Sequence, residues 1–148
     1  MAIKQLSVYL ENKPGTLAKI IRNISDAGIN IRALSLADTA EFGILRLITE
    51  DVEKAVELLS EKTIVKLSEV LAVKMDDQSG GLGAILDVLE ETRINIEYMY
   101  AFAAPDQSAY AVFRVDDAQS AEDYLNTKGI VTLQNGDLQN LLEVKKQS

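Results

Sequence analysis

The sequence predicts an α+β protein that contains two copies of one βαββαβ unit in tandem. Shifting the 148-residue chain along itself by 65 positions places "PGTL" at 14–17 on "SGGL" at 79–82. The same shift places "INI" at 29–31 on "INI" at 94–96. Both copies also alternate segments with the two-residue period of strands and segments with the period of helices. Together these observations indicate an internal repeat.

The first copy is predicted to span residues 1–69 in the order strand, helix, strand, strand, helix, strand. Leu17, Ile20 and Ile24 recur at helical spacing, with polar residues on the opposite face. The second helix begins after Asp51, a residue type that caps helix N-termini. The predicted elements are a strand at 3–10, a helix from Leu17 that stops at Gly28, strands at 29–38 and 41–49, a helix in "DVEKAVELLSEK" and a short strand in "TIVKL".

The second copy is predicted to span residues 70–148 and repeats this order. Its strands are expected near 70–75, 94–104, 108–115 and 130–133, its helices near 80–91 and 117–127, and a C-terminal tail with a short helix and a loose end at 134–148. The junction "LSEVLAVKM" contains no proline or glycine, so one copy should run almost directly into the next. Each copy then forms a ferredoxin-like sandwich, an antiparallel four-stranded sheet with two helices on one face.

Composition restricts the chemistry of the chain. A hydrophobic share of 47% is enough for a packed core. The absence of Cys and His excludes zinc-finger, iron–sulfur, thiol-nucleophile and Ser-His-Asp sites, and no cofactor is expected. A formal net charge of −8 opposes non-specific nucleic-acid binding. The N-terminal residues lack the apolar run of a signal peptide and no segment approaches a membrane span, which predicts a cytoplasmic protein without membrane association.

The "NKPGTL" loop before the first helix, the "GINI" after it and the repeated βαββαβ order together resemble the ACT domain family. The resemblance covers roughly residues 3 to 133 and is strongest to stand-alone proteins made of two ACT domains. It implies a regulatory module that binds amino acids or similar small ligands, usually at an interface between two such domains. The candidate ligand-binding residues are Glu11, Asn12, Lys13, Pro14, Gly15, Thr16, Leu17, Asn30 and Ile31 in the first copy, and Asp76, Asp77, Ser79, Gly80, Gly81, Leu82, Asn95 and Ile96 in the second.

The residue types in the first loop suit a zwitterion. The first amide N–H groups of a helix are unpaired and carry partial positive charge, so they can hold a carboxylate. Gly15 has no side chain to obstruct them, and Pro14 stiffens the approach. Glu11, Asn12 and backbone carbonyls can accept hydrogen bonds from an α-ammonium group.

The second loop keeps the glycine and changes the acceptors. Asp76 and Asp77 replace Glu11 and Asn12, and Ser79 replaces proline, so we expect two non-equivalent sites or a single site. Two alternatives stay open. Both loops can be only tight strand-to-helix turns, and the Asn residues of "INI" can either contact a ligand or stabilise a turn.

Two further patterns bear on partners. Arg46 and Arg114 lie in the third strand of their copies, where an arginine can grip a carboxylate but more often covers the sheet or pairs with an acid such as Glu97. Tyr98, Tyr100 and Phe102 share one face of a strand, and this face needs a sister domain or a second chain, which predicts a homodimer. An RNA-stacking platform would use similar aromatics, but the acidic charge opposes it.

The function predicted is that of an amino-acid sensor, not an enzyme, which passes its ligand state to a partner enzyme or protein. An alternative is a regulatory subunit of an amino-acid biosynthetic enzyme, as in the ACT-bearing small subunit of acetolactate synthase. A remote alternative is an acylphosphatase-like enzyme, since that class shares the βαββαβ order. The strand-to-helix loop lacks the arginine and the multiple-glycine cradle that phosphate would require.

Overall fold

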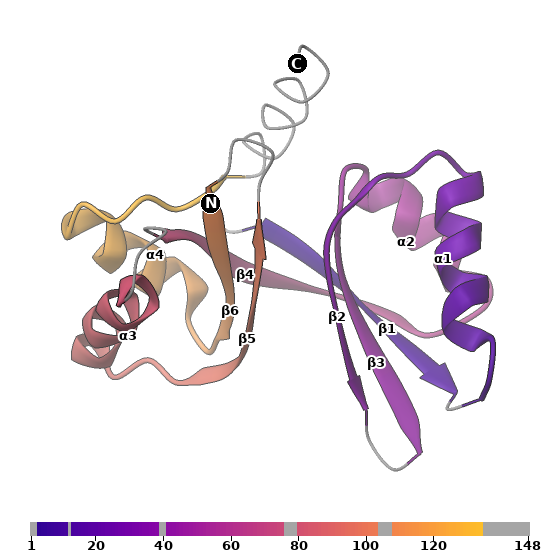
Figure 1. Cartoon of the computed structure of the whole chain (residues 1–148), viewed down its shortest axis with the longest axis horizontal. Coiled ribbons are helices and arrows are strands. Elements are labelled where there is room, and N and C mark those ends of the chain that lie inside the picture. The colour runs from indigo at the N-terminus through magenta and orange to yellow at the C-terminus, as the bar shows by residue number, and fades with distance from the viewer. Residues whose placement is uncertain (1–2, 12, 39–40, 76–79, 104–107, 135–148) are drawn as a thin grey trace. The chain divides into compact units, whose positions relative to one another are not determined.

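A computed structural model describes residues 3–11, 13–38, 41–75, 80–103 and 108–134 (Figure 1). These residues form strands β1 (Ile3–Glu11), β2 (Ile31–Asp38), β3 (Phe42–Thr49), β4 (Val65–Met75), β5 (Ile96–Ala103) and β6 (Ala109–Val115), and helices α1 (Thr16–Asp26), α2 (Val52–Ser60), α3 (Gly81–Thr92) and α4 (Ala118–Thr127). The predicted α+β fold class is confirmed, with the elements in the order of tandem ferredoxin-like domains.

The chain divides into two compact units. The first unit is Lys4–Ser68, and the second unit joins Met1–Ile3 to Glu69–Ser148. Strand β4 begins in the first unit and ends in the second. The short strand expected in "TIVKL" and the strand expected at 70–75 are therefore one continuous strand, because the residues between them include neither proline nor glycine to interrupt the pairing.

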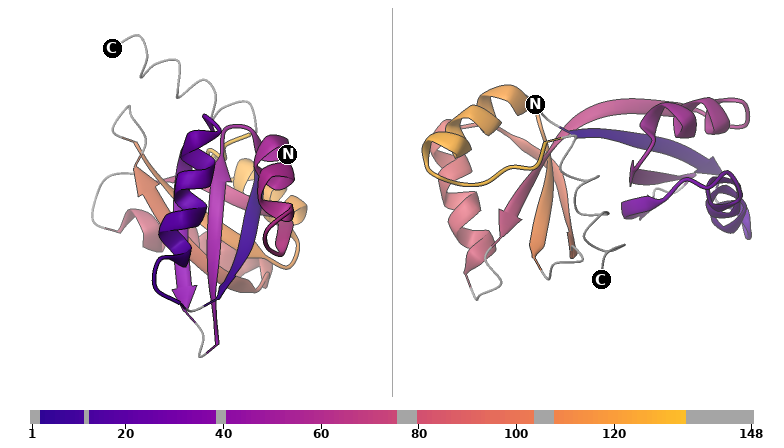
Figure 2. Two further views of the ribbon diagram at one scale, coloured as in Figure 1. Left: turned by 90° about the vertical axis from the view of Figure 1, so that its right-hand side faces the viewer. Right: turned by 90° about the horizontal axis from the view of Figure 1, so that it is seen from above.

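The first unit has the antiparallel sheet order β2-β3-β1. The N–H of Tyr9 donates to the carbonyl of Ile64 at 3.1 Å, which ties the segment before β4 to the other side of β1. Both helices of the unit, α1 and α2, lie on one face of this sheet, as the two views in Figure 2 show. The arrangement has the strand order of a ferredoxin-like sandwich.

Alternation along the strands creates the core of the first unit. Leu6 and Val8 face the helices and lie opposite Leu47 and Leu45 in the register of β1 with β3. The helices contribute residues one turn apart, which lie on the same side of a helix. The fully or nearly fully buried members of this core include Leu6, Val8, Leu10, Ile20, Ile24, Leu45, Leu47, Ala55 and Leu59.

The second unit repeats the plan with the sheet order β4-β6-β5. Its core contains Leu71, Val73, Ile85, Leu89, Ala111, Phe113, Ala121 and Leu125. The strand expected at 130–133 is only an isolated bridge between Val73 and Thr132. Two backbone hydrogen bonds flank this bridge, from Lys74 to Val131 at 2.9 Å and from Leu133 to Ala72 at 2.8 Å. The tail expected beyond residue 134 lies outside the described residues.

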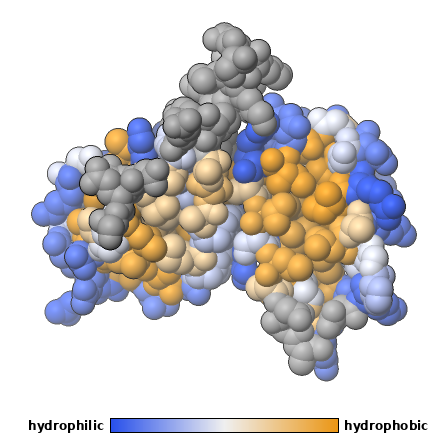
Figure 3. All heavy atoms as spheres, viewed as in Figure 1, coloured by the Kyte–Doolittle hydropathy of each residue, from blue (hydrophilic) through white to orange (hydrophobic). Residues whose placement is uncertain are grey.

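Hydrophobic side chains also reach the surface of the first unit. Orange spheres gather over β2 and β3 in Figure 3. Leu34 and Leu36 of β2 and Phe42 at the start of β3 are each about half exposed. Buried and exposed apolar groups thus occur on the same strand of this unit.

Candidate functional site

Helices α1 and α3 begin in the same unusual way. The residue before each helix is a glycine in the left-handed region, Gly15 with φ +85° and Gly80 with φ +90°. In the part of the chain that the structure describes, no side chain caps either helix. The first amide N–H groups of both helices therefore have no side-chain acceptor.

Helices α2 and α4 show the opposite solution. The N–H of Lys54 donates to the Asp51 carboxylate at 3.1 Å. Asp117 accepts hydrogen bonds from the N–H of Ser120 at 3.1 Å and from the hydroxyl of the same residue at 2.7 Å. Both hydrogen bonds lower the pKa of Asp117, and the one from the hydroxyl has the larger effect. In each unit one helix carries an aspartate cap and the other begins open, which leaves the open helix able to bind an external anion.

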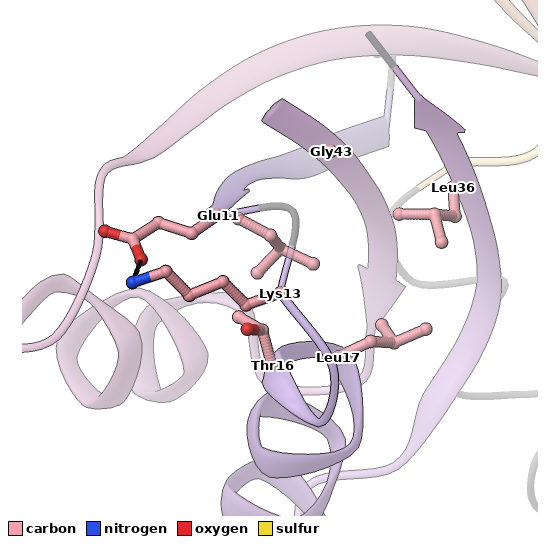
Figure 4. Close-up of a pocket in the computed structure, with 7 residues that line it drawn as sticks. Glu11, Lys13, Thr16, Leu17, Leu36 and Gly43 are labelled. Atoms are coloured by element: carbon pink, nitrogen blue, oxygen red, sulfur yellow. Dashed lines mark ion pairs between the residues drawn. The ribbon is translucent and has the colours of Figure 1, made fainter. Parts of the chain in front are cut away.

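A groove of about 210 Å³ lies beside the start of α1 (Figure 4). Its lining residues are Leu10, Glu11, Lys13, Thr16, Leu17, Leu36 and Gly43. On one side the Lys13 ammonium lies 2.9 Å from the Glu11 carboxylate, and Glu11 raises the pKa of Lys13 through this hydrogen bond and its charge. On the other side lie Leu17 of α1 and Leu36 of β2. The groove thus offers both charges and an apolar wall.

The structure brings together most of the residues predicted in the first loop. The groove is lined by Glu11, Lys13, Thr16 and Leu17. The backbone carbonyl of Lys13 also accepts a hydrogen bond from the N–H of Thr16 at 3.3 Å, which closes the turn that contains Pro14 and Gly15. Asn12 lies outside the described residues. Leu36 and Gly43 also line the groove, although the sequence did not single them out, because they come from β2 and β3 and their distance from the loop in sequence hides the contact.

Asn30 and Ile31 lie at the other end of α1. This helix has 11 residues, a length of about 16 Å, so they do not share a small ligand with the loop of their own copy. Asn30 donates from its side-chain amide to the Glu50 carboxylate at 2.8 Å, and the N–H of Glu50 donates to the Asn30 carbonyl at 3.0 Å. Arg32 lies 3.7 Å from the same carboxylate.

The second copy has a matching junction. The N–H of Asn95 donates to the Asp116 carboxylate at 3.2 Å, and the N–H of Asp116 donates to the Asn95 carbonyl at 3.4 Å. Both acids directly precede the capping aspartates Asp51 and Asp117, a signal that could have identified them. Ile96 begins β5 after this junction. Each "INI" asparagine therefore connects the start of its strand, β2 or β5, to the acid at the end of the following strand, β3 or β6, just before the aspartate that caps the next helix.

The loop of the second copy is described only in part. Gly80, Gly81 and Leu82 form the start of α3, and Leu82 packs against the core of the second unit. Asp76, Asp77 and Ser79 lie outside the described residues. The shared feature of the two loops is therefore the glycine-led, uncapped start of the helix.

Arg114 has the structural role that the sequence favours. Its guanidinium lies 3.4 Å from the Glu97 carboxylate and donates to the carbonyls of Glu69 at 3.2 Å and Val115 at 2.9 Å. Among the described residues, no group of three or more acidic side chains forms a candidate metal site. Within the same residues, none of the helices combines the length and apolar character needed to cross a membrane.

Comparison with known proteins identifies the family. The ACT domain pair family matches residues 1–142. Protein BT0572 from Bacteroides thetaiotaomicron, known from a crystal structure, is 34% identical to this chain. The match covers 93% of this chain and 96% of BT0572, with a TM-score of 0.86. The ligand-free regulatory subunit of aspartate kinase from Thermus thermophilus has the same fold, with a TM-score of 0.62 at 14% identity over 86% of this chain and 93% of its own.

A curated relative matches one part of the chain. The small subunit of acetolactate synthase isozyme 3 from Escherichia coli is 40% identical over 70 residues, which are 46% of this chain and 42% of that protein. The chain thus spans less than half the length of this relative. Together with the matched family and the repeated open helix starts, these findings confirm the resemblance noted in the sequence: the chain belongs to the ACT domain pair family.

Proposed function

We propose that this chain is a non-catalytic regulatory protein whose first unit binds a free amino acid at the start of α1. The observation that carries the proposal is the open, glycine-led helix start, which adjoins a groove with both charges and an apolar wall. Membership of a regulatory family supports the same function.

Each part of an amino acid has a suitable partner in the groove. The carboxylate would accept from N–H groups at the start of α1, where no side chain caps the helix. The ammonium group would lie against Glu11, and an apolar side chain against Leu17 and Leu36. The ion pair of Glu11 with Lys13 is no obstacle, because both side chains are about 70% exposed and exposed pairs contribute little to stability.

Asn30 and Ile31 belong to the proposal as contacts from a neighbouring domain, and the predicted residues of the second copy belong to it as a second site. Asn30 and Ile31 are too far from the loop of their own copy, so they would have to approach the loop of another. In the second copy, Asp76, Asp77, Ser79, Gly80, Gly81, Leu82, Asn95 and Ile96 would form a site that differs in its acceptors. We therefore propose domains at 1–69 and 70–148 with non-equivalent affinities.

A thermal-shift panel of the twenty amino acids tests the proposal, with calorimetry on any positive. A ligand at 100 times its dissociation constant stabilises by about 2.7 kcal/mol, a shift of several degrees for a chain of this size. Ala18 is an exposed residue of the first turn of α1, so Ala18→Asp should weaken carboxylate binding by about fivefold through repulsion at the helix start.

The matched control Ala18→Asn keeps the size of the side chain without the charge and should bind as the wild type does. A flat panel, or equal affinities for the two variants, would contradict an amino-acid site at α1. Calorimetry that finds two identical sites per chain would contradict the proposed difference between the copies.

A specific observation favours an enzyme as the regulated partner. The 70-residue match to the small subunit of acetolactate synthase supports a role as a regulatory subunit of an amino-acid biosynthetic enzyme of this kind. The test is to titrate the full chain into the catalytic subunit of acetolactate synthase and to measure its activity with and without the amino acid found in the panel. An unchanged rate and no co-elution would exclude this partner.

A further inference from the structure

A second cavity of the first unit lies between α1, the end of β1 and the turn that follows α2. Its volume is about 490 Å³, which is larger than the groove beside α1 and typical of small-molecule sites. The groove extends from α1 toward β2 and β3, whereas this cavity extends toward residues 62 and 63. The lining residues that bear on its chemistry are Leu10, Thr16, Lys19, Ile20, Asn23 and Lys62.

The floor and the far wall of the second cavity are held in place by the fold. Leu10 and Ile20 belong to the buried core of the unit. The hydroxyl of Thr63 donates to the carbonyl of Tyr9, and the N–H of Tyr9 donates to the carbonyl of Ile64 at 3.1 Å. The turn after α2 is therefore fixed to β1, and an apolar floor lies below polar walls.

The polar walls carry an excess of positive charge. Within the part of the chain that the structure describes, neither the Lys19 nor the Lys62 ammonium has an ion-pair or hydrogen-bond partner. Glu11 also lines the cavity, but Lys13 lies 2.9 Å from its carboxylate, and both side chains point away from Leu17 (Figure 4). This positive site belongs to a chain with a formal net charge of −8.

Helix stability does not explain the position of Lys19. Helix α1 begins at Thr16, so Lys19 lies at the end of its first turn, and this turn contains no acidic residue. The start of a helix carries partial positive charge, and a cation there is unfavourable. Such a conflict with a local rule is typical of functional positions. An anion in the second cavity would offset both positive charges.

Asn23 follows Lys19 one turn further along α1 and lines the same cavity. Its side-chain nitrogen Nδ2 is buried and has no hydrogen-bond partner among the described residues. A buried donor without an acceptor destabilises a fold. A rotation of this amide toward an anion in the cavity would supply the missing acceptor.

The second unit shows that the fold does not require these two polar residues. At the positions 65 residues later, Ala84 replaces Lys19 and Val88 replaces Asn23. Val88 packs against the core of its unit. An apolar pair therefore serves the same helix equally well, so the polar pair of α1 has another role.

Lys62 differs from its counterpart in the same way. The N–H of Lys62 donates to the carbonyl of Leu59 at 3.1 Å, and the N–H of Lys128 makes the matching bond to Leu125 at 3.0 Å. Both lysines are thus placed at the end of a helix, where a cation is favourable. The ammonium of Lys128, however, lies 3.9 Å from the Glu91 carboxylate, whereas that of Lys62 stays available for a ligand.

We propose that the second cavity binds a small dianion, of the kind found in a phosphate monoester or a dicarboxylate. The two ammonium groups of Lys19 and Lys62 match its two negative charges. The Thr16 hydroxyl and the Asn23 amide would donate hydrogen bonds, and the carbon part of the ligand would lie on Leu10 and Ile20. This site goes beyond the proposed amino-acid site and does not depend on it, because the cavity uses a different wall of α1.

A nuclear magnetic resonance titration of the ¹⁵N-labelled full chain tests the site in the absence of amino acids. Inorganic phosphate and succinate are added separately at neutral pH, and sodium chloride of equal ionic strength is the reference. We expect saturable shifts of the Lys19 and Thr63 N–H signals and of the Asn23 side-chain amide. The side-chain amide of Asn30, which donates to Glu50, should stay unchanged. The dianion with the lower dissociation constant identifies the ligand class, and shifts no larger than those with chloride would overturn the site.

Charge variants test the role of the lysines. Lys19→Met should weaken the binding of the preferred dianion by about fivefold, the upper range for a solvent-accessible ion pair. Lys4→Met makes the same charge change at an exposed position of β1 outside the cavity and should bind as the wild type does. Glu11→Gln should bind more tightly, because it removes a repelling charge and releases Lys13. Equal affinities for Lys19→Met and Lys4→Met would contradict the proposal.

Asn23→Val introduces the residue of the second unit and should have two opposite effects. The urea midpoint should rise, because a buried donor without a partner is removed. The affinity for the dianion should fall by about fivefold, because one hydrogen bond to an ion is lost. A stabilised variant that binds as tightly as the wild type would overturn the site. A flat amino-acid panel together with a saturable dianion titration would contradict only the amino-acid site, and the reverse result would contradict only this one.

Discussion

Helices α1 and α3 occupy matching places 65 residues apart, and they begin alike but end differently. Both follow a left-handed glycine without a side-chain cap. After α1 the left-handed residue is Gly28 with φ +75°, whereas after α3 the matching residue is Arg93 with φ +60°. The backbone geometry is therefore kept in both copies, while the residue that adopts it has changed in one of them.

The same contrast holds for the side chains around the loops and edges. The first unit has the ion pair of Lys13 with Glu11 beside its helix start and a row of exposed leucines on β2. The second unit has Gly81 and Gly83 in the first turn of α3 and an aromatic strand β5. The repeat thus preserves a fold and varies its surfaces, which allows one unit to bind or pair in a way that the other does not.

The largest expected effect tests whether the two cores are equivalent. Ile24 in α1 and Leu89 in α3 are matched and are at most 1% exposed. We expect Ile24→Ala and Leu89→Ala each to lower the free energy of unfolding by about 3 kcal/mol, through lost burial and a cavity. Urea unfolding measures both, with the exposed neighbours Ser25→Ala and Glu90→Ala as controls. A cost below about 1 kcal/mol at either site would contradict equal packing.

Exchanging the residues that end the two helices should give effects of opposite sign. Gly28→Arg places a side chain in the left-handed region and should destabilise the chain by about 1–2 kcal/mol. Arg93→Gly relieves that strain and should stabilise by up to about 1 kcal/mol, since glycine is the usual residue there. Thermal unfolding with Arg93→Ala as the control distinguishes this strain from the loss of the arginine side chain. Two effects of the same sign would show that the helix ends are not comparable.

The aspartate caps should matter in both units. Asp51→Ala removes the acceptor of the Lys54 N–H and should cost about 1 kcal/mol of stability. Asp117→Ala should act in the same direction, since Asp117 accepts two hydrogen bonds from Ser120. Asn at either position keeps an acceptor and serves as the control. Unchanged urea midpoints for both alanine variants would mean that the caps do not stabilise α2 and α4.

The smallest expected effect is a pH dependence confined to α4. Hydrogen bonds from Ser120 lower the pKa of Asp117 in the folded chain. Its contribution to stability is therefore present above the unfolded pKa of about 3.9 and is lost as the pH falls through the lower folded pKa. Asp117→Asn should lack this part of the acid sensitivity, measured as the difference in urea midpoint between variant and wild type from pH 6 to pH 2.5. A constant difference would contradict the shift.

The spacing of hydrophobic residues and the residues that begin and end helices were enough to predict the fold. Leu17, Ile20 and Ile24 define α1, and Asp51 marks the start of α2, because both signals are local. The unbroken β4 and the single bridge at Thr132 were not predicted, since strand length depends on which neighbour is available for pairing. A sequence shows the tendency of a segment to extend and leaves its partner undetermined.

The candidate site was predictable to the same extent. Loop residues such as Lys13 and Leu17 could be selected from the glycine at a strand-to-helix junction. Leu36 and Gly43 could not, because they reach the groove through the register of three strands. The separation of Asn30 from the loop by the length of α1 also required the structure. The chemistry of each segment could thus be predicted from the sequence, whereas the contacts between segments could not.

The left-handed glycines before α1 and α3 also determine which chemical changes these positions tolerate. Among the described residues, no atom would lie within 4 Å of a Cβ added at Gly15 or Gly80, apart from their neighbours in the chain. The obstacle to an L-alanine is therefore the handedness of the backbone, not space. A D-alanine has the opposite preference, so chemical synthesis could insert one at either position, restrict the unfolded chain and stabilise it by roughly 0.4–1 kcal/mol. Mirror-image residues would thus fix both helix starts in place without adding a side-chain acceptor for their N–H groups.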